Sequence, residues 1–138
     1  MYNLKLLEKI SKIVRYEIIK QSFYKKSGHL GGSLSCADIM VNVFNKYIFK
    51  NERNTFILSK GHCALTLYSV LFQAKKLSKK SFYSFASKGS LFGEHPSPKI
   101  KNKYINFSTG SLGHGLSFAS GIAYSRILKK KQGYIFVL

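Results

Sequence analysis

The sequence predicts an α/β layer fold in which helices flank a mostly parallel sheet. Two observations support this class. Apolar side chains recur at helical spacing over residues 4–23 and in later segments, whereas residues 55–58 and 134–138 are short and apolar, as buried strands are. The 138 residues are about one domain long, so we expect a single domain over residues 1–138.

The first element is expected to be an amphipathic helix over residues 4–23. Four aliphatic side chains recur there at intervals of three or four residues: Leu7, Ile10, Val14 and Ile18. This spacing places them on one face of a helix, which can then pack against the core.

A loop is expected next, over residues 24–34, because it contains three closely spaced glycines. The second helix would be capped by the hydroxyl of Ser33 or Ser35, with Asp38 in its first turn near the positive helix end. Its expected apolar face comprises Ile39, Val43, Phe44 and Tyr47.

The remaining chain alternates strands, turns and helices. The expected order is a strand at 55–58, a turn at 59–62, a helix at 63–74, a short helix from Ser78 to Phe85, a long loop at 88–115, a helix at 116–128 and a strand at 134–138. Ligands of such sheets bind beyond the carboxyl ends of the strands. The turn at 59–62 is therefore expected to border a site, and the long loop is of a length that is usually functional or disordered.

The net charge of +18 is the unusual feature of the composition. Such an excess is typical of proteins that bind nucleic acid, anionic membranes or acidic partners. Only three of the 23 basic residues are arginines, however, and arginine is the preferred side chain for bidentate contacts with phosphates and bases. A generally lysine-rich surface is favoured, and a dedicated nucleic-acid surface remains the less favoured interpretation.

Cysteine usage and hydropathy favour a cytoplasmic protein. Two cysteines, Cys36 and Cys63, are too few for a disulfide framework, which indicates a reducing compartment. Apolar runs are much shorter than the ~20 residues of a membrane span, so we expect no membrane association. The charged N-terminal segment does not have the pattern of a secretory signal.

All four histidines are expected in loops, next to glycine or proline. The four sites are Gly28-His29, Gly61-His62, His95-Pro96 and Gly113-His114-Gly115. Glycine lets the backbone approach a ligand closely, and histidine can donate or accept protons near neutral pH. A solvent-exposed loop position explains any one of these histidines equally well, but it explains the set less well.

Other site chemistries fit the sequence less well. His62 and Cys63 are adjacent, and the chain has no C-x-x-C or H-x-x-x-H spacing, so we expect no metal site made by these side chains. Cys63 is followed by Ala-Leu-Thr-Leu, which is typical of packing rather than of a nucleophile. The glycines also form neither a P-loop nor a dinucleotide fingerprint. The ligand is expected to carry phosphate or hydroxyl groups.

Four motifs in order resemble the amino-terminal part of transketolases. They are SGHLGGSLSCADI, RNTFILSKGHCALTLYSVL, GEHPSP and STGSLGHGLSFASGIA, and they span nearly the whole chain. The similarity is greatest to the split type, in which the thiamine-diphosphate-binding half is a separate subunit. Deoxyxylulose-phosphate synthases have a similar first motif, but LSKGH and EHPSP are more like transketolase.

The resemblance implies thiamine diphosphate as the cofactor and assigns roles to the histidines. The histidine matching His29 lies near the thiazolium ring and the donor sugar, and the one matching His95 faces the substrate. His62 would contact the diphosphate region, so the implied catalytic residues are His29, His62 and His95. The implied cofactor-binding residues are His62, Gly110, Ser111, Leu112, Gly113 and His114.

Two departures from the family pattern qualify this resemblance. His114 stands where the family commonly has glutamine. The family's Gly-Asp-Gly motif, whose aspartate helps to hold magnesium, follows the strand that ends here at Leu138. We therefore expect an incomplete, truncated domain of the thiamine-diphosphate-binding type, with magnesium ligands that are not in this chain and no activity of the chain alone.

The resemblance also implies partners and a reaction. A complete enzyme of this family transfers two-carbon ketol units between sugar phosphates in the pentose phosphate pathway, with a carboxy-terminal half or subunit and by homodimerisation. Two alternatives stay open. The chain could be a basic module that binds nucleic acid or another polyanion, or a non-catalytic partner subunit of a transketolase.

Overall fold

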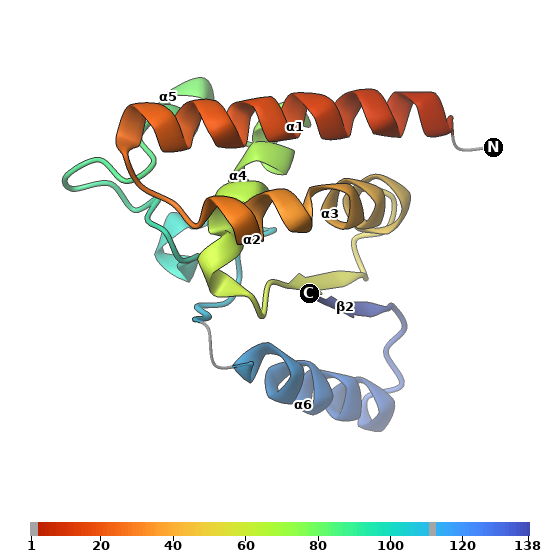
Figure 1. Ribbon diagram of the computed structural model, residues 1–138. Coiled ribbons are helices and arrows are strands. Elements are labelled where there is room, and N and C mark those ends of the chain that lie inside the picture. The colour runs from red at the N-terminus through yellow and green to blue at the C-terminus, as the bar shows by residue number, and fades with distance from the viewer. Residues whose placement is uncertain (1–2, 111–112) are drawn as a thin grey trace.

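The structure is a computed structural model that describes residues 3–110 and 113–138, and it has the expected α/β class (Figure 1). Its elements are α1 (Leu4–Lys25), α2 (Leu30–Ser35), α3 (Ala37–Val43), the π-helical turn η1 (Phe44–Ile48), β1 (Thr55–Ile57), the 3₁₀ turn η2 (Gly61–Cys63), α4 (Ala64–Gln73), α5 (Lys79–Tyr83), the 3₁₀ turn η3 (Pro98–Ile100), α6 (His114–Leu128) and β2 (Ile135–Val137).

The two strands pair in parallel, as the sequence predicted. Thr55 lies opposite Ile135 and Ile57 lies opposite Val137 in the register. The pairing continues past the strands, because the N–H of Leu138 donates to the carbonyl oxygen of Ile57 at 3.1 Å and that of Lys60 donates to Leu138 at 2.9 Å. The ends of both strands therefore meet beside the turn that follows β1.

Helices lie on both sides of this small sheet. Figure 1 shows α1 across α4 and the α2–α3 segment on one side, and α6 on the other side. α1 packs against α3 and α4, while α6 packs against β2. None of the helices in the described part of the chain is long and apolar enough to cross a membrane.

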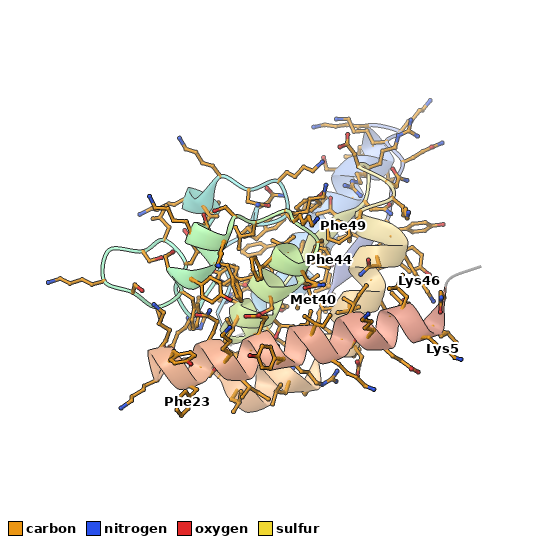
Figure 2. All side chains as sticks on the ribbon, turned by 90° about the horizontal axis from the view of Figure 1, so that it is seen from above. Lys5, Phe23, Met40, Phe44, Lys46 and Phe49 are labelled. Carbon is orange, nitrogen blue, oxygen red and sulfur yellow. The ribbon has the colours of Figure 1, made fainter. Side chains whose placement is uncertain are left out.

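The hydrophobic core lies between α1, α3 and α4. Of the expected face of α1, Leu7, Val14 and Ile18 are buried, which confirms that helix. Figure 2 shows Met40 and Phe44 pointing into the interior, whereas Lys5 and Phe23 project outward from α1. Almost the whole of α4 is buried, so this helix forms the centre of the domain and holds the turn before it in place.

The loop expected over residues 24–34 is wrong in its second half, because α2 begins at Leu30. The carbonyl oxygen of His29 accepts from the N–H of Ser33 at 2.9 Å, which closes the first helical turn. Neither Ser33 nor Ser35 caps the following helix: α3 starts after Cys36, and the Ser35 hydroxyl donates to Gly32. Packing against the η2 turn, rather than local propensity, stabilises this glycine-rich helix.

The apolar face expected for the second helix is also partly wrong. Ile39 and Tyr47 are 53% and 43% exposed, while the buried side chains of this stretch are Ala37, Met40, Val41, Phe44 and Ile48. The helix restarts after Cys36, and the N–H of Phe49 then bonds to Phe44 across five residues, which is the π-helical spacing. Both features shift the face away from the one that uninterrupted 3.6-residue spacing predicts.

The later elements agree with the prediction except at their ends. The Ser78 hydroxyl accepts from the N–H of Ser81 and caps α5, as expected, although α5 ends at Tyr83 rather than at Phe85. In the described residues 88–110 of the long loop, the short turn η3 is the only regular structure. α6 begins at His114, two residues before the expected start, because Gly113 with φ of 72° caps its N-terminus.

Candidate active site

The turn that follows β1 places His62 at the carboxyl end of the strand. Gly61 lies directly against another backbone segment: its N–H donates to the carbonyl oxygen of Gly110 at 2.9 Å, and a Cβ atom would overlap the carbonyl group of Thr109. Only glycine permits this approach. The Thr109 hydroxyl also donates a hydrogen bond to the carbonyl oxygen of Leu58, so the two segments are joined at two points.

The imidazole of His62 lies between this turn and α2. A Cβ atom at Gly32 would be 3.2 Å from its Cδ2 and 3.3 Å from its Nε2, so glycine at this position leaves room for the ring. Its Nδ1 is buried and has no hydrogen-bond partner within the described residues. Burial lowers the pKa of His62, and repulsion from His29, Lys60 and His95 lowers it further. The ring is therefore neutral at neutral pH and can accept a proton or a hydrogen bond.

Three of the four histidines come together. The ring centroid of His29 lies 5.4 Å from that of His62 and 6.0 Å from that of His95. They come from three separate segments: the start of α2, the η2 turn and the loop before η3. His29 and His95 are exposed, whereas His62 is partly buried, so the cluster presents imidazole nitrogens to a ligand from the solvent side. We call these three residues the histidine cluster.

The second group of expected site residues is only partly described. Gly110 adjoins the histidine cluster through its bond to Gly61, and Gly113 adopts a left-handed conformation at the N-terminus of α6. Ser111 and Leu112 lie outside the described residues. The imidazole of His114 is exposed and lies near Phe118 of its own helix, with ring centroids 6.4 Å apart, and among the described residues it makes no ring contact with the other three histidines.

Several residues that sequence reasoning did not assign support the site. The carboxylate of Glu94 accepts hydrogen bonds from the segment before His29, and the buried Tyr68 hydroxyl donates to the carbonyl oxygen of His95 at 3.2 Å. Burial raises the pKa of Tyr68, so its hydroxyl stays protonated. The Ser59 hydroxyl accepts from the N–H of Gly115 and ties α6 to the turn. Only the position of Glu94 beside His95 gave a signal in the sequence.

This arrangement has the features of a ligand site built on loops at the end of a parallel sheet. A family model described as "Transketolase, thiamine diphosphate binding domain" matches residues 7–133. The chain belongs to this family. The resemblance of the four motifs to transketolases is thereby confirmed.

Three curated relatives show how much of a transketolase this chain represents. It is 30% identical to one subunit of the apulose-4-phosphate transketolase of Phocaeicola vulgatus, over 96% of the chain and 49% of that protein. It is 33% identical to human transketolase over 95% of the chain and 22% of that protein. For mouse transketolase-like protein 2 the identity is 29%, with 95% and 22% covered. The chain thus spans between about a fifth and a half of the length of these relatives.

The residues of this transketolase domain fit a thiamine diphosphate ligand in part. The buried Nδ1 of His62 has no partner among the described residues, and Lys60 is close enough to lower the pKa of this ring, so the site offers a hydrogen-bonding nitrogen and a positive charge. The fit to a magnesium ion is poorer. The described residues contain no group of three or more histidine, cysteine, aspartate or glutamate side chains placed to hold a metal ion, so they do not by themselves fit a magnesium site.

Both cysteines of the transketolase domain are free and buried. The Sγ atom of Cys36 lies 3.7 Å from the Thr66 hydroxyl, and the thiol of Cys63 follows His62 directly. The interaction of the two thiols lowers the pKa of Cys36 and raises that of Cys63. Their burial agrees with a packing role and gives a ligand no access to sulfur.

Proposed function

We propose that this domain binds thiamine diphosphate at the histidine cluster and takes part in the transfer of two-carbon ketol units between sugar phosphates. The observation that carries the proposal is the convergence of His29, His62 and His95 from three separate loops beside the backbone of Gly110. Membership of the transketolase family supports the cofactor, and the names of the curated relatives support the reaction.

The chain's own residues would bind and orient the cofactor and would transfer protons. Thiamine diphosphate, when bound, supplies the carbanion-stabilising chemistry that ketol transfer needs. His62, neutral because of its lowered pKa, would hydrogen-bond the diphosphate region through its ring nitrogens. His29 and His95 are exposed and would exchange protons with substrate hydroxyl groups. The backbone of Gly110 and the residues 111–114 would hold the remaining end of the cofactor.

The proposal includes magnesium and a partner. A diphosphate requires charge neutralisation, and oxygen ligands of a magnesium ion are the usual means. We place these ligands outside the described residues. The resemblance to transketolases also implies a glutamate that activates the aminopyrimidine of the cofactor, and we place it in a carboxy-terminal half or subunit. Homodimerisation, sugar-phosphate substrates, the pentose phosphate pathway and a cytoplasmic location belong to the same proposal.

A nuclear magnetic resonance titration tests cofactor binding. The ring signals of all four histidines are followed while thiamine diphosphate and magnesium are added up to about 1 mM, which detects even weak binding. We expect shifts at His29, His62 and His95, and a loss of most of the effect in a His62→Ala variant. Thiamine without its diphosphate is the control ligand, and Lys9→Ala on the exposed face of α1 is the control variant. Unchanged histidine signals would refute the proposal.

An activity assay tests the reaction. The chain, extended by the segment that carries the magnesium ligands, is mixed with a carboxy-terminal transketolase half, and ketol transfer between sugar phosphates is measured in a coupled assay. We expect turnover only with all of these parts, because the chain supplies the histidines, the added segment holds magnesium and the partner supplies the activating glutamate. Turnover by the chain alone at an ordinary enzyme rate, about 1–10³ per second, would contradict this division of roles.

The net charge favours a second candidate, a surface that binds polyanions. Arg53, Arg126, Lys130 and Lys131 border a cavity of about 520 Å³ at the C-terminal end of α6. Both arginines are already engaged: Arg53 with Gln132, and Arg126 with backbone carbonyls and Thr55. Association with random duplex DNA, followed by fluorescence anisotropy, should weaken steeply with salt if this candidate is correct. Absence of association removes it.

A further inference from the structure

One side chain joins the two loops that carry His29 and His95. The Oε1 atom of Glu94 accepts a hydrogen bond from the Ser27 hydroxyl at 2.5 Å and a second from the N–H of Gly28 at 2.7 Å. Glu94 directly precedes His95, and the Ser27-Gly28 pair directly precedes His29. The two bonds therefore connect backbone segments that are 66 and 67 residues apart in sequence.

The conformation of Gly28 directs its N–H toward this carboxylate. Its φ angle is +108°, a value that side-chain-bearing residues rarely adopt, and a Cβ atom there would be 3.1 Å from the Ser22 hydroxyl. The hydrogen bonds from Ser27 and Gly28 lower the pKa of Glu94, so this carboxylate is ionised at neutral pH. Ionised acceptors make shorter and stronger hydrogen bonds than neutral ones.

Two further contacts limit the movement of the same loops. The Nζ atom of Lys25 donates to the Ser87 hydroxyl at 2.7 Å, which joins the end of α1 to the beginning of the second loop. Tyr68, on the buried helix α4, holds the carbonyl of His95 from the other side. The residue between these two anchors, Glu94, then decides how far the His95 segment lies from the His29 segment.

We propose that Glu94 is a positioning residue that sets the spacing of His29 and His95. Without its carboxylate, the Lys25–Ser87 bond at the far end is the one hydrogen bond left between the two loops among the described residues. The contact of Tyr68 fixes the His95 backbone to α4 but not to the His29 segment, and the ring of His95 is exposed. The proposal deepens the proposed function, because the spacing matters to a ligand that contacts both rings, but the spacing itself can be measured without a ligand.

The test compares two substitutions of Glu94 with a matched control. Glu94→Ala removes both hydrogen bonds, whereas Glu94→Gln keeps an oxygen that can accept both and removes only the charge. Glu52→Gln is the control, because Glu52 is also a loop acid that accepts a hydrogen bond, from Lys103, and among the described residues it bonds to neither the His29 segment nor the His95 segment. The first readout is the nuclear Overhauser effect between the ring protons of His29 and His95 in the unliganded chain. The second is the affinity for thiamine diphosphate.

We expect Glu94→Ala to lose the Overhauser effect and to bind thiamine diphosphate about tenfold more weakly, since two hydrogen bonds to a charged group are removed. Glu94→Gln should restore the Overhauser effect and most of the affinity, and Glu52→Gln should match the unsubstituted chain. Urea unfolding checks that all variants are folded; if Glu94→Ala is not, the Gln variant is compared with Ser27→Ala, which removes one bond.

The two readouts distinguish failure of the positioning role from failure of the proposed function. An Overhauser effect that persists in Glu94→Ala, or that is lost equally in Glu94→Gln and Glu94→Ala, overturns the positioning role. If the unsubstituted chain does not bind thiamine diphosphate while the Overhauser effect responds as expected, the proposed function fails and the positioning role stands.

Discussion

Replacing Gly61 by alanine should separate the turn that carries His62 from the backbone of residues 109 and 110. The added methyl group would overlap the Thr109 carbonyl and lie 2.9 Å from the backbone nitrogen of Gly110. The atoms that it meets belong to backbone, which cannot rotate away as a flexible side chain does. One of the two segments must therefore move, and the hydrogen bond from the Gly61 N–H to Gly110 is strained or lost.

The expected loss of stability has two parts, the steric overlap of the new methyl group and the strained or lost hydrogen bond. Forcing extra atoms into a packed region typically costs about 1–3 kcal/mol. A backbone hydrogen bond contributes about 0.5–1.5 kcal/mol net. We expect Gly61→Ala to lower the free energy of unfolding by roughly 2–4 kcal/mol, a large part of the roughly 5–15 kcal/mol of an ordinary domain.

Urea unfolding followed by circular dichroism measures this loss, with Gly121→Ala as the matched control. Gly121 lies inside α6, and a Cβ atom there would meet no atom within 4 Å. Alanine is the better helix former, so the control should gain up to about 1 kcal/mol. A Gly61→Ala protein with the unfolding midpoint of the unsubstituted chain would refute the close approach of the two segments.

Three further outcomes are expected. The bidentate pair of Arg15 and Asp38, at 2.7 and 2.6 Å, lowers the pKa of Asp38; it should stabilise the fold at pH values above the ordinary aspartate pKa and lose this effect as pH falls through the lowered value. Because Asp38 is 66% exposed, Asp38→Asn should cost less than about 1 kcal/mol in urea unfolding at pH 7 and nothing in strong acid. A thiol reagent should modify Cys36 and Cys63 about 10³-fold more slowly in the folded chain than in denaturant, because both are buried and reaction must await opening; rapid modification of the folded chain would contradict their burial. Phe44→Ala should lower the free energy of unfolding by about 3–5 kcal/mol, measured in urea, because Phe44 is fully buried; a loss below about 1 kcal/mol would place it outside the core.

The local sequence pattern was sufficient to predict the helix and the strands that bury one regular face. The spacing of Leu7, Val14 and Ile18 predicted α1, and the short apolar segments predicted both strands, because burial of such residues needs only a partner surface, whatever its identity. The Ser78 cap was also predictable from local sequence, because the Ser78 hydroxyl and the N–H of Ser81 from which it accepts are only three residues apart.

Pattern failed where a distant segment decides the conformation. The sequence from Gly31 to Ser35 has poor helix propensity, yet it forms α2 because it packs against the η2 turn, where the absence of a side chain at Gly32 leaves room for His62. The apolar face of the next helix was misjudged because a π-helical turn changes the spacing, and periodicity at 3.6 residues does not foresee it.

The sequence by itself determined the class of fold, the family and the candidate histidines, since these depend on residue types and on their order along the chain. Only the tertiary structure decided which candidates form one group: His29, His62 and His95 meet, while the ring contact described for His114 is with Phe118 on α6. It also revealed Glu94 as the link between two of them. The physical reason is that a hydrogen bond or a ring contact acts over a few ångströms in space. The residues that it joins here are more than 30 positions apart in the chain, and local pattern carries no record of such distances.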